Sequence, residues 1–240
     1  MTFAGIDGCK AGWLLITYKS GSYTWNLLPE ISQLPLKLND SARVFIDMPI
    51  GLPSKNYPRT IEKVLRDELE NRRSTVFNVP AKQSVYESNR QKAKALNIEI
   101  LGKSLSEQSL NIKSKIQEVD LFLNDKPNDL VLIESHPELC FKYLKGSVLQ
   151  TKKSEKSGIE ERLKILKKYD TACSMIYENI FKNTLRKHVK SDDIVDALVL
   201  CIANKLNGEL QFDFLQDDNI EDEENNKIQI GYFDPVKLEL

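Results

Sequence analysis

Two short segments of this chain are apolar at successive positions rather than at alternate ones. One is the run from Ala42 to Met48, which contains the sequence VFI, and the other extends from Leu130 to Glu134. Strands with this composition are buried on both faces, as parallel strands are when helices cover each side of a sheet. The two segments therefore predict an α/β fold whose sheet includes parallel strands.

The N-terminal part of the chain has the pattern of an antiparallel meander. Phe3 to Asp7, Trp13 to Tyr18 and Tyr23 to Leu28 are strand-like, and the short connections between them contain glycine. Glycine allows the positive φ angles that tight turns often require. We therefore expect a mixed sheet, in which an antiparallel meander is followed by parallel strands, and a short edge strand from Ile228 to Phe233.

Apolar residues at helical spacing predict the helices that flank this sheet. They cover Thr60 to Asn71, Ser104 to Asn124, a helix that runs through Leu144, one amphipathic helix that includes Ile159 to Ile176, and Ser191 to about Leu206. Ser135 and Glu138 have the spacing of a capping box, and Ser191 is the expected N-cap of the last helix. We expect one domain over residues 1–240 with a helical insertion at about 54–124, and a flexible surface loop from Asp217 to Glu224.

Composition limits the class of protein. The 240-residue chain is 41% hydrophobic, which is sufficient for a packed core. Its four cysteines are scattered without a CxxC pair, so they predict neither a disulfide framework nor a zinc site, and a reducing cytoplasm fits them. The apolar stretch Ala197 to Ala203 is too short to cross a bilayer, so we expect a cytoplasmic protein with no membrane partner.

Charge is distributed unevenly along the chain. From Lys142 to Lys190 there are 13 Lys and Arg against 5 Asp and Glu, a balance of 13 − 5 = +8, whereas residues 209–240 carry 2 Lys against 10 acids, 2 − 10 = −8. The basic stretch is consistent with binding to a polyanion such as nucleic acid. It is equally the pattern of a solvated helix face, so it leaves the choice open.

Five carboxylates stand at positions where folding can bring them together. Asp7, Asp47 and Glu134 end strand-like runs, and the carboxyl ends of neighbouring parallel strands meet at one crevice. Asp193 and Asp196 are three residues apart, on one side of the last helix. Such a cluster requires divalent cations, because like charges a few ångströms apart raise one another's pKa.

Some of these acids also have an ordinary structural explanation. An aspartate such as Asp7 often begins a turn, and helix capping accounts for Asp193. Capping does not account for Asp196, which lies among apolar residues and should have a partner there. Glu138 is expected to cap its own helix, so Glu134 is the preferred ligand on its strand.

Four motifs in a fixed order resemble a known superfamily. The segments GIDGCKAGW, FIDMPIGLP, LIESHPELCF and DDIVDALVL are similar to the ribonuclease-H-like superfamily, and more closely to the predicted-nuclease family called domain of unknown function 429. In layout they also resemble the Holliday-junction resolvase branch of that superfamily. The resemblance implies that Asp7, Glu134, Asp193 and Asp196 are metal ligands, with Asp47 as a further acid beside them.

The function that this resemblance implies is hydrolysis of DNA or RNA. Two Mg²⁺ or Mn²⁺ ions held by the acids would activate water and stabilise the leaving oxygen. One alternative is a nucleotide-binding phosphotransferase or ATPase of the same superfold, in which GIDGCKAGW holds phosphates. The other is a noncatalytic binding scaffold that retains the acids.

Two arginines and three further polar residues are secondary candidates. Arg72 and Arg73 could grip a substrate phosphate, or they could simply supply basic charge at a helix C-terminus. His136, Glu118 and Asp120 lie near the motifs without a defined role. The sequence leaves open both the choice of nucleic acid and the oligomeric state.

Overall fold

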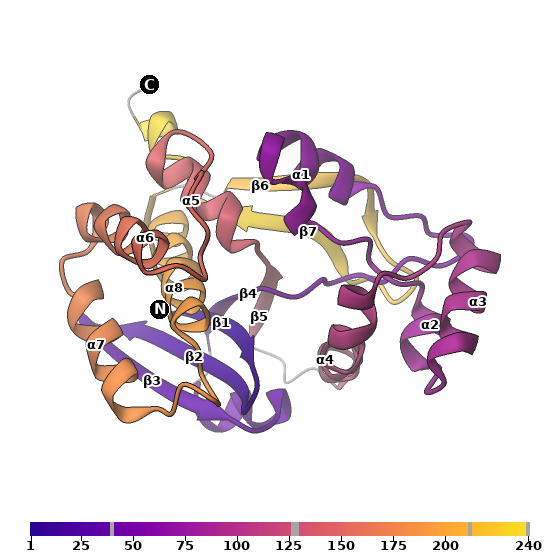
Figure 1. Ribbon diagram of the computed structural model, residues 1–240, viewed down its shortest axis with the longest axis horizontal. Helices are drawn as coiled ribbons and strands as arrows, with labels where there is room; N and C mark the ends of the chain where they lie inside the picture. Colours follow the sequence, from indigo (N-terminus) through magenta and orange to yellow (C-terminus); the bar gives the residue numbers. More distant parts are fainter. Residues whose placement is uncertain (39–40, 126–129, 211–212, 239–240) are drawn as a thin grey trace. The chain divides into compact units, whose positions relative to one another are not determined.

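The computed structural model describes residues 1–38, 41–125, 130–210 and 213–238, and they form two compact units (Figure 1). The first unit comprises Met1–Asp47, Pro127–Phe214 and Gly231–Leu240, and the second comprises Met48–Lys126 and Leu215–Ile230. The helical insertion expected at about 54–124 falls within the second unit, which also includes residues 215–230.

A mixed five-stranded sheet forms the centre of the first unit. Its strands are β1 (Thr2–Cys9), β2 (Gly12–Lys19), β3 (Ser22–Leu28), β4 (Ala42–Ile46) and β5 (Val131–Glu134). The strand order is β3-β2-β1-β4-β5; β1, β2 and β3 pair antiparallel, whereas β4 pairs parallel with both β1 and β5. The prediction of an α/β fold with a mixed sheet is therefore confirmed.

Packing explains one glycine of the first hairpin. Gly12 has a φ of +125°, and a Cβ atom there would lie 2.1 Å from the carbonyl oxygen of Leu28. Only glycine combines this conformation with such a close approach. The hairpin therefore brings β2 against the end of β3 without strain.

The expectation of two strands buried on both faces is correct for only one of them. All five residues of β4 are buried, whereas β5 begins with Val131, whose side chain is 53% exposed. The difference arises because β4 is an interior strand and β5 is at the edge of the sheet. The prediction of a wholly buried strand from Leu130 to Glu134 is thus wrong for its first half.

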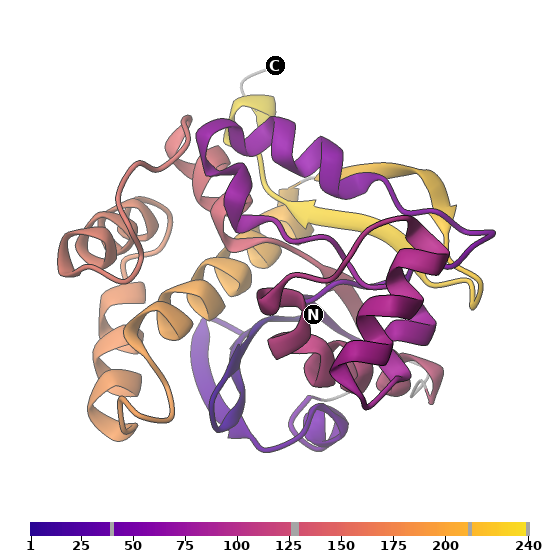
Figure 2. The same cartoon turned by 45° about the vertical axis from the view of Figure 1, so that its right-hand side comes forward.

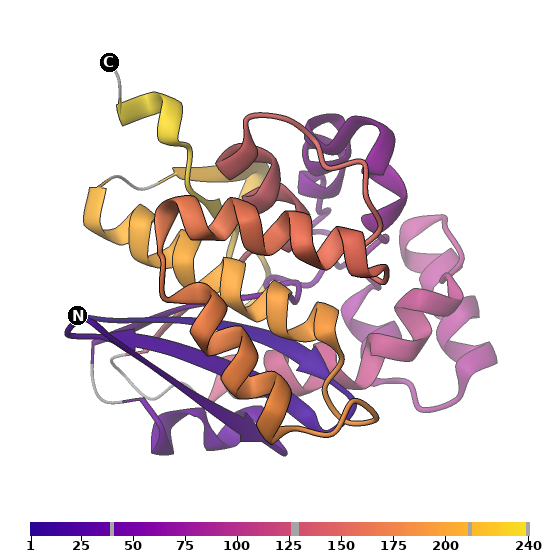
Figure 3. The same cartoon turned by 60° about the vertical axis from the view of Figure 1, so that its left-hand side comes forward.

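Helices of the first unit pack against the sheet and against each other. They are α5 (Pro137–Lys145), α6 (Lys156–Tyr169), α7 (Cys173–Asn183) and α8 (Ser191–Leu210), with short 3₁₀ helices at Ile31–Leu36 and Pro235–Leu238. Helix α8 crosses β1 and β2, α7 packs beside it on β3, and α6 packs on α8 (Figure 3). The long apolar helix α8 is therefore the main cover of this sheet face.

The single amphipathic helix expected across Ile159 to Ile176 is two helices, α6 and α7. Asp170 ends α6, and its carboxylate accepts hydrogen bonds from the hydroxyl of Tyr23 at 2.6 Å and from the backbone N–H of Ala172 at 3.0 Å. A half-buried carboxylate without hydrogen bonds costs free energy, so the hydrogen bonds to Asp170 favour ending α6 here over continuing the helix. The apolar spacing was correct, but it does not reveal the break.

Two expected helix caps are also replaced by other contacts. Ser135 donates its hydroxyl to the carbonyl of Gly231 at 2.7 Å, and Glu138 pairs with Arg162 at 2.6 Å, so the capping box does not form. The last helix begins at Ser191 itself, and the carboxylate of Asp193 accepts the backbone N–H of Lys190 at 2.7 Å. At α5, partners distant in sequence thus take the side chains that a local pattern assigns to capping, whereas at α8 the cap is local but comes from Asp193 instead of Ser191.

The second unit is mainly helical. It contains α1 (Ile61–Leu69), a 3₁₀ helix at Glu70–Thr75, α2 (Lys82–Tyr86), α3 (Arg90–Leu101) and α4 (Glu107–Asn124). Helices α2, α3 and α4 gather in one cluster (Figure 2). Strands β6 (Asp213–Glu221) and β7 (Lys227–Tyr232) pair in a two-stranded sheet. Of the helices that the structure describes, none is long and apolar enough to cross a membrane.

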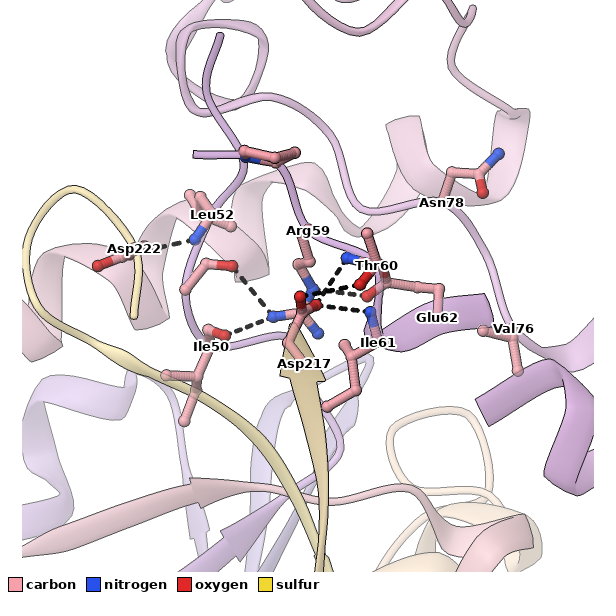
Figure 4. Close-up of polar contacts among 12 residues, drawn as sticks. Ile50, Leu52, Arg59, Thr60, Ile61, Glu62, Val76, Asn78, Asp217 and Asp222 are labelled. Carbon is pink, nitrogen blue, oxygen red and sulfur yellow. Dashed lines mark hydrogen bonds and ion pairs between the residues drawn. The ribbon is translucent and has the colours of Figure 1, made fainter. Parts of the chain in front are cut away.

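The acidic segment expected to be a loop from Asp217 to Glu224 is instead partly strand β6. Buried Asp217 accepts hydrogen bonds from the backbone N–H groups of Thr60 and Ile61, each at 2.6 Å, and so caps α1 (Figure 4). Asp222, also buried, accepts the N–H groups of Leu52 and Asn226. Carboxylates can be buried here because backbone donors satisfy them.

Candidate functional site

Strand register places Asp7 beside Asp47. Ile6 of β1 pairs with Ile46 of β4 in the parallel ladder, and the backbone N–H of Asp47 donates to the carbonyl of Ile6 at 3.1 Å. The ladder therefore extends one residue beyond β4. Because equivalent positions of paired strands face the same side of a sheet, Asp7 and Asp47 project to the same face.

Helix α8 brings Asp196 to this face. Gly5 lies two residues before Asp7 and so on its side of the sheet, and a Cβ atom on Gly5 would lie 2.2 Å from the backbone nitrogen of Cys201 and 2.4 Å from the carbonyl oxygen of Ala197. Further along the helix, the side-chain amide of Asn204 donates to the carbonyl of Ala4 at 2.8 Å. The start of α8 therefore lies beside the carboxyl end of β1, where Asp7 is.

Asp7, Asp47 and Asp196, here called the acid cluster, repel one another in a poorly solvated environment. Burial raises the pKa of Asp7 well above its usual value, and the charges of Asp196 and Asp47 raise it further. Burial raises the pKa of Asp47 to about 7, although Lys153 opposes this change. Burial also raises the pKa of Asp196, again against the effect of Lys153. The cluster therefore favours bound protons or cations.

Lys153 supplies the positive charge that faces the acid cluster. Its ammonium donates to the carboxylate of Asp196 across 2.5 Å, and the negative charges of Asp196, Asp7 and Asp47 hold the pKa of Lys153 above its usual value. The sequence motifs do not identify this residue. Lys153 lies in the basic stretch next to another lysine, and no local pattern distinguishes the two.

Asp193 lies at the edge of the acid cluster and also has the capping role described above. Its pKa is raised to about 6, mainly by burial, and repulsion from Asp192 and Asp196 contributes. The bond that it accepts from Lys190 lowers this pKa. Asp193 thus satisfies both interpretations of its position, as a cap and as a neighbour of Asp196.

Glu134 is close to the acid cluster in the sheet, but its position in the strand register is one residue out of phase with Asp7 and Asp47. It pairs with Ile46, so strand alternation places it on the face of Ile46 rather than on that of Asp47. Glu134 is buried, and its charge contributes to raising the pKa of Asp47. The residue in phase with Asp7 and Asp47 is Ser135, which directly follows β5 and whose backbone N–H donates to the carbonyl of Ile46 at 2.9 Å. Across the described ranges, no three His, Cys, Asp or Glu side chains are arranged to hold a metal ion.

The secondary candidates have identifiable local positions. Arg72 and Arg73 lie in the second unit, on the 3₁₀ helix after α1, where Arg73 is exposed and donates to the carbonyl of Glu70 at 2.9 Å. Asp120 is buried and accepts the hydroxyl of Tyr86 at 2.6 Å. Half-buried His136 occupies the N-cap position of α5, and Glu118 is half-buried on α4.

Fold and site together define an α/β protein with a cluster of carboxylates, two buried and one half-buried, at the carboxyl ends of β1 and β4. The chain belongs to the family described as protein of unknown function, DUF429, whose model matches residues 5–212. This match confirms the family that the four motifs indicated. Comparison with curated proteins and with solved structures gives no match.

Proposed function

We propose that this protein is a divalent-metal-dependent nuclease with a ribonuclease-H-like fold, and that it hydrolyses phosphodiester bonds of DNA or RNA. The observation that carries the proposal is the convergence of the acid cluster, from two parallel strands and one helix, on one face of the sheet. The order of an antiparallel meander followed by parallel strands supports the fold. This order of strands is the one expected from the resemblance to the ribonuclease-H-like superfamily.

The chemistry of these side chains fits Mg²⁺ or Mn²⁺. The donors are carboxylate oxygens, which suit hard divalent ions, and no cysteine or histidine is among them. Asp7 and Asp196 would hold the metal, with Asp193 as a neighbouring ligand, whereas Glu134 takes the other face of the sheet and acts on Asp47 through its charge. A bound ion would lower the pKa of a water molecule and neutralise developing charge.

Asp47 has the properties of the general base in this proposal. Strand register places Asp47 beside Asp7, and a bound divalent ion would lower its raised pKa, so that its carboxylate is ionised and able to accept a proton. In the proposed reaction the Asp47 carboxylate accepts a proton from the attacking water. Lys153, which faces the acid cluster, is available for binding a phosphate of the substrate, and Arg72 and Arg73 of the second unit stay a separate prediction for phosphate binding.

The phosphate-hairpin alternative has less support. In GIDGCKAGW, the packing of Gly12 against Leu28 is sufficient to explain that glycine, so it is not evidence for a phosphate. Measurable affinity for a nucleoside triphosphate in calorimetry would favour the phosphotransferase over the nuclease.

Cleavage assays on a substrate panel test the proposal. We expect the wild-type protein to cleave at least one of single-stranded, duplex or branched DNA or RNA in Mn²⁺ or Mg²⁺, and not in EDTA. Asp47→Asn should slow this cleavage by roughly 10²- to 10⁴-fold, as expected for loss of a general base. Asp67→Asn, which alters an exposed acid on α1, is the matched control and should be fully active. A wild-type protein inactive on the whole panel with both metals would refute the proposal.

A further inference from the structure

Strand β3 leaves one edge of the five-stranded sheet open. It is the outermost strand in the order β3-β2-β1-β4-β5, and among the described residues no further strand pairs with its outer side (Figure 1). Proteins commonly protect such an edge with charged residues, proline or a β-bulge. The sequence of β3, SYTWNLL, contains no charged residue and no proline, and its register with β2 is continuous from Ser22 to Leu28. This edge is therefore suited to pairing with another strand.

The turn before β3 determines which backbone groups lie along the open edge. The two residues between Lys19 and Ser22 have φ angles of +49° and +84°, and Lys19 pairs with Ser22, as in a two-residue hairpin turn. The last residue of such a turn donates its N–H to the carbonyl of the first. Along an antiparallel strand, alternate residues then direct their N–H and C=O groups toward the partner strand and away from it. Three residues direct these groups outward: Tyr23, Trp25 and Leu27.

Helix α7 extends this edge on one face of the sheet. Asn179 of α7 accepts the indole N–H of Trp25 at 2.8 Å. Met175 lies one turn earlier on the same side of the helix, and its side chain is 67% exposed. On the other face of β3, Thr24 is exposed. The edge thus has an exposed apolar side chain beside one face and an uncharged polar side chain on the other.

A second copy of the same edge is complementary to it. Two β3 strands related by a two-fold axis at Trp25 run antiparallel, and this register places Tyr23 opposite Leu27 of the partner subunit. The three outward-facing residues can then exchange all their N–H and C=O groups with the other strand. Lys19 is exposed before β3, and it would come near Glu30 of the partner subunit, which is exposed after β3. The two ends of the pairing therefore carry opposite charges.

We propose that this protein forms a two-fold symmetric homodimer through antiparallel pairing of its β3 strands, so that the sheet continues from one chain into the next. The pairing uses the open edge of both chains at once, and it therefore closes as a dimer and does not continue as a fibre. The inference goes beyond the proposed nuclease activity and does not depend on it.

Sedimentation velocity over a dilution series tests the dimer. We expect the wild-type chain to sediment as a dimer that dissociates on dilution. Thr24→Lys places two like charges diagonally across the strand pair, so it should raise the dimer dissociation constant about five- to tenfold. Ser147→Lys adds the same charge to an exposed residue after α5 and is the matched control, which should dimerise as the wild type does.

A charge swap tests the register of the pairing. In the proposed dimer Thr24 is directly opposite Asn26 of the partner subunit. Asn26→Asp alone should weaken the dimer, because it also brings two like charges together. A mixture of Thr24→Lys chains and Asn26→Asp chains should associate more tightly than either variant does alone, since opposite charges then face each other across the strands.

Hydrogen exchange locates the contact on the wild-type chain itself. The backbone N–H groups of Tyr23, Trp25 and Leu27 should exchange slowly in the concentrated protein and faster after dilution. Exchange at these positions that does not depend on concentration would overturn the inference. So would a dimer that Thr24→Lys weakens no more than Ser147→Lys does.

A wild-type chain that is monomeric at every concentration would also overturn the dimer. If its edge N–H groups became protected only when an extended peptide of another protein was added, the edge would belong to that different partner. Circular dichroism checks that each variant is folded. None of these outcomes changes the expected metal-dependent cleavage, so the dimer and the proposed function can fail separately.

Discussion

Replacing Asp47 by asparagine should stabilise the metal-free protein at alkaline pH. Burial raises the pKa of Asp47 from 3.8 to about 7, and repulsion from Asp196 and Glu134 adds to this, against the opposing effect of Lys153. A carboxyl with a raised pKa holds its proton more tightly in the folded state. It therefore favours folding below pH 4, and this contribution is lost as the pH rises through about 7.

The size of this effect follows from the two pKa values. Each tenfold change in proton affinity is worth about 1.4 kcal/mol, so the change from 3.8 to about 7 corresponds to on the order of 4 kcal/mol. Most of the loss develops between pH 4 and pH 7, where the unfolded chain has released the proton and the folded protein still holds it. An asparagine side chain carries no such charge, so the Asp47→Asn variant avoids this loss.

Urea unfolding in EDTA at pH 4 and at pH 8 measures the prediction. The free energy of unfolding of Asp47→Asn should exceed that of the wild type at pH 8 by a few kcal/mol, with a much smaller difference at pH 4. Asp170→Asn is the opposite control, because hydrogen bonds from Tyr23 and Lys205 contribute to lowering the pKa of Asp170. That variant should lose stability at pH 8. An Asp47→Asn protein no more stable than wild type at pH 8 would refute the reasoning about the acid cluster.

Two further substitutions test the packing inside the units, one in each unit. Asp217→Ala removes the acceptor for two backbone N–H groups at the start of α1, so urea unfolding should show a loss of about 2 kcal/mol, whereas exposed Glu223→Ala should have little effect. Gly5→Ala would place a methyl group 2.2 Å from the backbone of α8 and should cost roughly 3 kcal/mol or more, measured as a lower thermal midpoint. A Gly5→Ala protein that melts with the wild type would contradict the close contact between β1 and α8.

Local patterns predicted much of the first unit. The meander, the strand that contains VFI and the amphipathic helices are all present, because alternation and helical spacing are properties of a few consecutive residues. The acids at the ends of β1 and β4 were identified for the same reason. Their convergence could be expected, since neighbouring parallel strands end at the same edge of a sheet.

Other features depend on partners far away in the chain. The break at Asp170 depends on Tyr23, and the burial of Asp217 depends on α1, so an acidic run that resembled a solvated loop became part of a strand. The edge position of β5 left Val131 exposed, although its neighbours in sequence suggested a buried strand. None of these contacts leaves a periodic signal in the sequence.

The sequence by itself determined the α/β class and which carboxylates end the strands, because these depend on short-range patterns of apolar and acidic residues. Only the tertiary structure decided which face each acid takes and which cation meets it. One step of register separates Glu134 from Asp47, and of two adjacent lysines it is Lys153 that pairs with Asp196, whereas Lys152 pairs with Glu155. Register and close packing arise between segments, so they exist only once the chain is folded.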